Sequence, residues 1–213
     1  MNKPLCSLAG LETQNLITTP GAIMNDNNLQ HITVKNDLSF SMAKALLYSL
    51  IFIIPLVVLL VNIYFIVWGE PHVVIENTIL FILKLILVAF LGVVLHELIH
   101  GLSWVYFSKK TFDTIKFGFQ WKTLTPYAHS TEPMEVTAYR LGAMMPGLLM
   151  GVFPYLLGII TGNVWIMFFG SFFTLSAIGD ALVLWSIRKI KSGQLVEDHS
   201  TRCGCYVIEP QNN

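Results

Sequence analysis

Residues 77–107 read NTILFILKLILVAFLGVVLHELIHGLSWVYF, a long apolar run that carries His96, Glu97 and His100 in its second half. A membrane-spanning helix needs about 20 predominantly apolar residues, and this stretch is longer than that. Ionisable side chains are costly inside a bilayer, so a cluster of three in such a run indicates a function. We therefore expect a membrane helix that carries a polar site.

The composition of the whole chain also indicates an integral membrane protein. Of its 213 residues, 54% are hydrophobic and 12% are charged, whereas soluble domains carry about 25% charged residues. The formal net charge is zero and no basic stretch is present, which argues against a nucleic-acid partner. The cysteines Cys6, Cys203 and Cys205 are too few for a disulfide framework, and we interpret Cys203 and Cys205 as reduced, inert thiols.

Four apolar segments are long enough to cross a bilayer, so the predicted fold is an all-α membrane protein with four transmembrane helices. The expected spans are residues 43–68, 77–107, 137–160 and 162–187. Together they form a four-helix transmembrane domain over residues 43–187, and Ser41 is the expected N-cap of the first span. An N-terminal segment, residues 1–42, is expected to be partly disordered, and residues 188–213 form a C-terminal tail.

The distribution of basic residues predicts an orientation. Lys and Arg occur before span one, between spans two and three, and after span four, but not in the other two connections. By the positive-inside rule, both termini and the middle loop are therefore cytoplasmic. We expect a multi-pass protein of the cell membrane, with the lipid bilayer as its surroundings.

Two short stretches outside the spans have the pattern of β-strands. In the middle loop, IKFGFQWKTLT alternates loosely between apolar and polar residues, which predicts a short cytoplasmic β-hairpin-like loop between spans two and three. A further short strand is expected around CYVIE in the tail.

The spacing of the two histidines predicts a zinc site. His96 and His100 are four residues apart, so on a helix they project from one face, and Glu97 lies at the edge of that face. This is the HExxH pattern, in which two neutral imidazoles bind Zn²⁺ and the glutamate is the general base that accepts a proton from the attacking water. We therefore predict Zn²⁺ as the cofactor and Glu97 as the catalytic residue.

A catalytic zinc usually has a third protein ligand and an open position. The candidates for the third ligand are Asp180, His129, Glu132 and Glu135. His100 lies nine residues before Lys109, and Asp180 lies eight residues before Arg188. At a rise of about 1.5 Å per residue, these positions are about 13 Å and about 12 Å from the same membrane edge, so the side chains of His100 and Asp180 can lie at the same depth and contact each other. We therefore choose Asp180 and keep Glu132 and Glu135 as the alternatives.

The HELIHG sequence, followed by PYAHSTEP and by a Gly-Asp pair in a later span, resembles the putative zincin peptidase family of small membrane proteins. That family is related to the site-2 protease-like intramembrane zinc metalloproteases. The resemblance covers about residues 80–190 and implies a zinc site of His96, His100 and Asp180, with Glu97 catalytic, at the cytoplasmic side of the membrane. Better-known site-2 proteases carry the third ligand in LDG after an Asn-Pro pair, whereas this chain has Gly179–Asp180 and no such pair before it.

The PYAHS stretch offers two further candidate site residues. Tyr127 or His129 is placed to polarise a carbonyl or to orient the substrate near the metal. The alternative is a loop that is held by its own turn hydrogen bonds. A strand beside the site would also suit an unwound substrate that pairs with its edge.

The function predicted from these residues is a zinc-dependent, membrane-embedded endopeptidase. It would hydrolyse peptide bonds of a membrane-inserted or membrane-adjacent protein, with water activated by zinc and Glu97. The alternatives are a non-proteolytic membrane protein that binds metal and a structural membrane scaffold. The sequence leaves the substrate, the cleavage site and the oligomeric state open.

Overall fold

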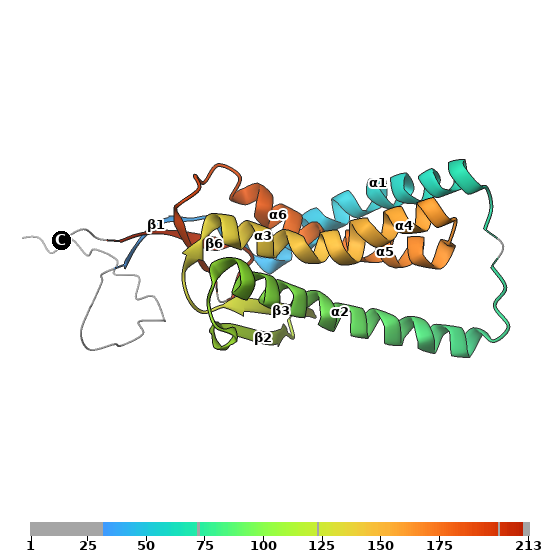
Figure 1. Cartoon of the computed structure of the whole chain (residues 1–213), viewed down its shortest axis with the longest axis horizontal. Helices are drawn as coiled ribbons and strands as arrows, with labels where there is room; N and C mark the ends of the chain where they lie inside the picture. Colours follow the sequence, from blue (N-terminus) through green and yellow to red (C-terminus); the bar gives the residue numbers. More distant parts are fainter. Residues whose placement is uncertain (1–31, 72, 123, 200, 211–213) are drawn as a thin grey trace, which may run out of the picture. The chain divides into compact units, whose positions relative to one another are not determined.

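The computed structural model describes residues 32–71, 73–122, 124–199 and 201–210 (Figure 1). It is mostly helical, and four of its helical segments are long and apolar enough to cross a membrane, which confirms this part of the prediction. These segments are Met42–Trp68, Thr78–Ser108, Val136–Thr161 and Val164–Ser186. Their length and composition are compatible with a membrane protein.

The first two segments are single helices, α1 (Met42–Trp68) and α2 (Thr78–Ser108). Each begins at a side chain that satisfies an otherwise free backbone amide. The Ser41 hydroxyl accepts from the Lys44 amide at 3.3 Å, as predicted for the N-cap, and the Asn77 side chain accepts from the Leu80 amide at 2.9 Å. Only 6% of the most apolar window of α2 is buried, so most of its side chains face outward.

The third and fourth segments are built from shorter helices. They are α3 (Val136–Pro146), the π-helical segment η2 (Gly147–Val152), α4 (Phe153–Thr161), α5 (Val164–Ser176) and α6 (Ile178–Ser186). The π-helical turns follow Pro146, which has no amide hydrogen to donate to the helix. A Cβ at Gly158 would lie 2.4 Å from the Met167 nitrogen, so α4 and α5 approach too closely for any side chain there.

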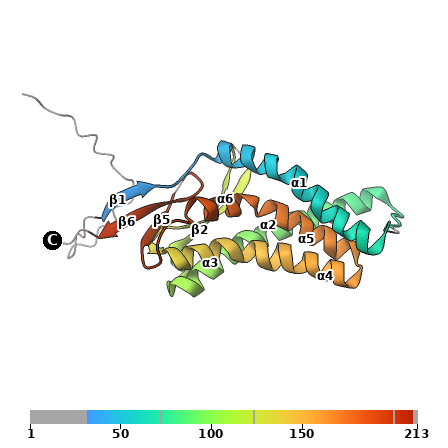
Figure 2. The ribbon, with the colours of Figure 1, turned by 90° about the horizontal axis from the view of Figure 1, so that it is seen from above.

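Helices α1 and α2 pack on different parts of the bundle. Helix α2 packs mainly on α3, α4 packs on α5, and α1 packs on α5 and α6. In the vertical direction of Figure 1, α4 and α5 lie between α1 at the top and α2 at the bottom. Figure 2 shows the same bundle from above, with α1 along one side and α3 and α4 along the other.

The middle loop forms a β-hairpin, as predicted. After a short 3-10 turn, η1 (Phe112–Thr114), strand β2 (Ile115–Gln120) pairs antiparallel with β3 (Thr125–Ser130). The hairpin lies against the second half of α2, since a Cβ at Gly101 would come within 2.6 Å of the Phe117 ring. The pairing therefore brings the PYAHS residues of β3 next to the helix that carries the histidines.

A four-stranded sheet corrects the all-α prediction. Its strand order is β1-β6-β5-β4, formed by β1 (Ile32–Asp37), β4 (Met134–Glu135), β5 (Leu195–Asp198) and β6 (Cys205–Pro210). Strand β6 contains the strand expected around CYVIE. Strand β1 lies in the segment that was expected to be partly disordered, and the rest of that expectation, residues 1–31, falls outside the described residues. The sheet forms because its apolar side chains are covered by the ends of the helices.

This contact between sheet and helices is the larger buried cluster. It joins Val196 and Val207 of the sheet to Trp104, Tyr139 and Ile187 of α2, α3 and the end of α6. Cys205 belongs to the same cluster, and burial raises the pKa of its thiol to about 12. Burial likewise raises the pKa of Cys203 to about 11, so both thiols are protonated at neutral pH. Both are free cysteines.

Candidate metal centre

One face of α2 carries its buried residues. They are Gly92, His96, His100, Gly101 and Trp104. Positions 92, 96, 100 and 104 are each four residues apart, so they form a stripe along one side of the helix. The Phe173 ring of α5 fills the space beside Gly92, where a Cβ would lie 2.1 Å from the ring. The two histidines are therefore enclosed by the bundle, although the helix that carries them is mostly exposed.

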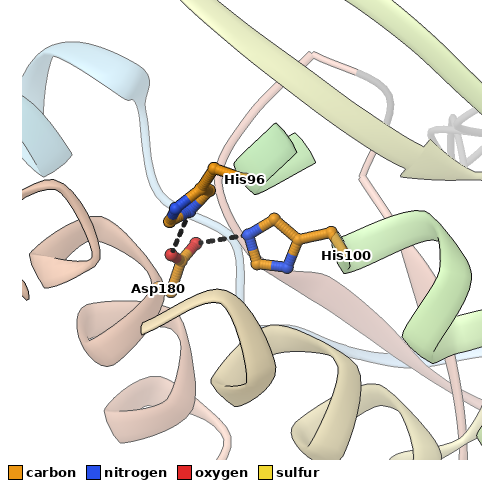
Figure 3. Close-up of side chains that lie close together, drawn as sticks. All are labelled: His96, His100 and Asp180. Carbon is orange, nitrogen blue, oxygen red and sulfur yellow. Dashed lines mark hydrogen bonds and ion pairs between the residues drawn. The ribbon is translucent and has the colours of Figure 1, made fainter. Parts of the chain in front are cut away.

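The structure brings His96 and His100 together with Asp180, which lies in the first turn of α6 (Figure 3). His96 Nε2 is 3.2 Å from Asp180 Oδ2, and His100 Nε2 is 3.4 Å from Asp180 Oδ1. One ligand atom from each residue lies within 4.8 Å of the other two. These are the three residues that the histidine spacing and the depth argument selected.

His100 is held in one orientation. Its Nδ1 donates to the Gly142 carbonyl of α3 at 3.0 Å, which leaves the Nε2 lone pair directed at Asp180. Gly142 has no room for a side chain, since a Cβ would lie 2.1 Å from the Trp104 ring. Trp104 in turn stacks on His100, with ring centroids 5.5 Å apart. The close approach of α3 thus fixes the tautomer and the direction of this candidate ligand.

His96 is held differently. Its ring stacks on Phe173 with centroids 6.4 Å apart, and its Nδ1 is buried with no hydrogen-bond partner among the described residues. An unpaired buried polar atom is costly, and apolar packing alone would favour a hydrocarbon side chain there. The imidazole is therefore best explained by what its Nε2 binds.

The chemistry of the three donors fits a zinc ion. Two neutral imidazoles and one carboxylate are a donor set that catalytic Zn²⁺ takes, with a further position left open. The carboxylate offsets part of the charge of a divalent ion, and the imidazoles add none. His96, His100 and Asp180 are thus the residues that would hold the metal.

Glu97 lies beside this group in a cavity of about 390 Å³. Its side chain is half-buried, and the backbone amide of Ala128 in β3 hydrogen-bonds to the carboxylate. The walls of the cavity come from α1, α2, the hairpin, α3, α6 and the C-terminal segment, and they include all three candidate ligands. The carboxylate therefore shares one cavity with the proposed metal ligands.

The two candidates from PYAHS both line this cavity. The Tyr127 ring lies over Gly118 of the paired strand, where a Cβ would be 2.4 Å from the hydroxyl oxygen. The His129 Nδ1 is 3.0 Å from Asp198 Oδ2 in β5. The loop is thus a paired strand that presents side chains to the cavity.

The alternative third ligands lie elsewhere. Glu132 pairs with Lys110, with Oε2 2.7 Å from Nζ. Glu135 accepts from the Thr137 hydroxyl at 2.9 Å and from the Gly193 amide at 3.0 Å, where α3 begins. Within the part of the chain that the structure describes, neither carboxylate belongs to the group that gathers around His96 and His100.

Sequence reasoning missed Asp198 and Tyr139. The Asp198 carboxylate accepts from the His129 ring and, at 2.9 Å, from the Tyr139 hydroxyl, and both residues line the cavity. In the sequence Asp198 lies in a polar stretch of the tail, QLVEDHS, which is typical of an exposed segment. Nothing in that stretch indicates that it folds back onto the helices.

A family model described as "Putative zincin peptidase" matches residues 89–195, about half of the chain. The chain belongs to this family. Membership in the zincin peptidases supports a metallopeptidase and implies zinc, and the matched residues include His96, Glu97, His100 and Asp180. No curated protein and no solved structure matches the chain. The cavity of this family member extends beyond the matched residues, to α1 between Met42 and Ile53 and to the C-terminal residues Asp198, His199 and Thr201–Gly204.

Proposed function

We propose that the protein is a zinc-dependent endopeptidase embedded in a membrane, with Glu97 as its general base. The observation that carries the proposal is the convergence of His96 and His100 of α2 with Asp180 of α6, beside Glu97 in one cavity, on helical segments apolar enough to span a bilayer. A membrane helix would not otherwise hold so many ionisable groups. The family match supports the same chemistry.

In the proposed reaction the metal and Glu97 have separate chemical roles. Zinc, when bound by the three ligands, supplies Lewis-acid activation of water and of the scissile carbonyl. Glu97 accepts one proton from the attacking water as the oxygen bonds to the carbonyl carbon. It then gives that proton to the amide nitrogen as the C–N bond breaks, so that one peptide bond and one water become an acid and an amine.

The substrate in this proposal is an extended stretch of a membrane-inserted or membrane-adjacent polypeptide. Strand β3 supports this idea, because its Ala128 amide faces Glu97 and its backbone therefore borders the cavity. A peptide bound alongside a strand edge gains main-chain hydrogen bonds independent of its side chains. Tyr127 and His129, on the same strand, are proposed to support the substrate.

The membrane arrangement is proposed on the distribution of charge. Apart from Lys84 in the first half of α2, the basic residues lie in or next to the hairpin and the two chain ends, so these parts are assigned to the cytoplasmic side of the cell membrane. The metal centre then lies in the cytoplasmic half of the bilayer. The resemblance to site-2 protease-like enzymes belongs to this proposal, without transfer of their substrate handling.

The test is Glu97→Gln in protein purified into nanodiscs. We expect about one zinc per chain in both the wild type and the variant, because Glu97 is not a ligand. Cleavage of labelled β-casein and of a quenched single-span peptide should fall about 10²- to 10⁴-fold in the variant. Zinc content is measured by mass spectrometry and cleavage by fluorescence.

Glu132→Gln is the matched control, because it neutralises a carboxylate that pairs with Lys110 and does not line the cavity. It should cleave like the wild type. Equal cleavage by wild type and Glu97→Gln would contradict the proposal. A wild type that holds zinc but cleaves neither probe would favour the non-proteolytic metal-binding protein, and a wild type without zinc would favour the scaffold.

A further inference from the structure

The Asp198 carboxylate is held by hydrogen bonds from three sides. It accepts from the Tyr139 hydroxyl at 2.9 Å, from the Ser130 amide at 3.3 Å, and from His129 Nδ1 at 3.0 Å. Its side chain is only 11% exposed. Asp198 comes from β5, three residues past the end of the family match, so the matched region alone does not contain it.

The contact with Asp198 determines which ring nitrogen of His129 is free to bind a group in the cavity. An ionised carboxylate only accepts hydrogen bonds, so the ring nitrogen that faces it carries a proton. A proton that the ring gains or loses is therefore exchanged at Nε2. His129 and Glu97 both line the cavity, and Ala128, the residue before His129, donates its backbone amide to Glu97.

A stack of rings joins this group to the metal centre. Tyr139, which donates to Asp198, stacks on Trp104 with centroids 5.6 Å apart and an interplanar angle of 15°. Trp104 stacks on His100 at 5.5 Å. Close-packed side chains of this kind keep a fixed spacing, so Asp198 and the metal ligands are held relative to one another.

We propose that Asp198 is a positioning residue, which holds His129 with Nε2 directed at the scissile carbonyl of the substrate. This inference rests on the proposed peptidase function. With one proton on Nδ1, held by Asp198, and a second on Nε2, the His129 ring is an imidazolium and donates a hydrogen bond to the carbonyl oxygen as that oxygen gains negative charge. No proton leaves the ring in this step, because Glu97 carries the proton of the water. The C-terminal strands are thus part of the reaction site.

The test compares two ligands of the zinc-loaded protein in nanodiscs. A phosphinic pseudopeptide with an alanine on each side of the phosphorus mimics the tetrahedral carbon and its charged oxygens. Acetohydroxamate binds the metal without that shape. In Asp198→Asn, we expect the affinity for the phosphinic probe to fall about tenfold, the size of one charge-assisted hydrogen bond. Acetohydroxamate affinity and zinc content should stay within about twofold, since no ligand is changed.

Three further variants separate positioning from structure. His129→Gln should show the same selective loss, and adding Asp198→Asn to it should cause no further loss. Glu132→Gln, which neutralises a carboxylate that pairs with Lys110 and does not line the cavity, should bind both probes as the wild type does. An equal loss of both probes in Asp198→Asn, or no loss of either, would overturn the inference.

A second measurement needs no bound probe. The ¹⁵N signals of His129, identified by their disappearance in His129→Gln, should report a protonated Nδ1 in the wild type. In Asp198→Asn the amide can accept or donate, so the ring should exchange between tautomers. Tautomer exchange already present in the wild type would overturn the inference. Failure of the proposed function would instead appear as a wild type that lacks zinc and binds neither probe.

Discussion

The two halves of α2 are both strongly apolar in sequence, yet only the second half has a face that is buried in the protein. The first half, residues 78–91, exposes most of its large side chains, with Ile79 at 74% and Ile86 at 59%. The second half carries His96 and His100, whose side chains are buried, with only 7% and 5% of their surface exposed. Hydropathy alone does not separate a helix surface that faces lipid from one that faces protein. The polar residues and their spacing make that distinction.

Glycine explains much of the difference. The first half of α2 contains no glycine, whereas Gly92 and Gly101 lie in the second half. The Phe173 ring of α5 and the Phe117 ring of β2 occupy the space that side chains at these two positions would fill. Small residues allow close helix packing, so they determine which half of α2 becomes part of the site.

The largest contrast between the halves is expected from removal of a ligand. His100→Ala should lower zinc affinity by about 100-fold or more, because loss of a supporting group alone costs about 10- to 100-fold. Leu83→Ala, in the exposed half, should leave zinc affinity unchanged. Chelator competition followed by metal analysis measures both variants. Stoichiometric, tightly held zinc in His100→Ala would show that the metal is not bound here.

A smaller contrast is expected from one added methyl group. Gly92→Ala should lower the free energy of unfolding by about 1–3 kcal/mol through overpacking, offset in part by about 1 kcal/mol of helix propensity. Phe173 cannot move aside easily, because it is 1% exposed and packs on Phe169 and His96. Leu91→Ala, next along the helix and 56% exposed, is the control and should change stability little. Thermal unfolding in detergent compares the two, and equal midpoints would refute the packing argument.

The smallest contrast concerns two tryptophans with similar hydrogen bonds. Trp104 Nε1 donates to the Tyr139 carbonyl at 3.2 Å in a buried position, and Trp68 Nε1 donates to the Ile159 carbonyl at 2.7 Å in an exposed one. Trp104→Phe should lower the free energy of unfolding by about 1–2 kcal/mol, because it removes a hydrogen bond from a buried site that water does not reach. Trp68→Phe should cost less than about 0.5 kcal/mol, since water replaces the lost bond. Denaturant titration measures both, and a larger effect at Trp68 would reverse the comparison.

The grouping of His96, His100 and Asp180 was predictable because its signals are local or periodic. The helical spacing places His96 and His100 on one face, and equal distances from the basic edges place Asp180 at the same level. The structure brings these three residues together. The hairpin followed from alternation in a short loop. In each case neighbouring residues, or a count along two helices, were sufficient.

The four-stranded sheet and Asp198 were not predictable in the same way. Strand β1 pairs with β6 across more than 160 residues of sequence, and a short strand has too few residues to set its partner by alternation. Asp198 becomes a site residue only because β5 pairs with β6 and β4, which carries the tail back to Tyr139 and His129. A polar residue in a tail has no pattern that distinguishes this role from simple exposure.

The π-helical segment η2 rotates the second half of the third span relative to its first half. A π turn takes up one residue more than an α turn, which rotates everything beyond it by about 100° relative to a straight helix. Gly142, before it, meets Trp104 of α2, and Gly158, after it, meets Met167 of α5. Each half of the span thus packs on a different helix. The rotation of the second half against α5 therefore does not change how Gly142 and its carbonyl meet Trp104 and His100.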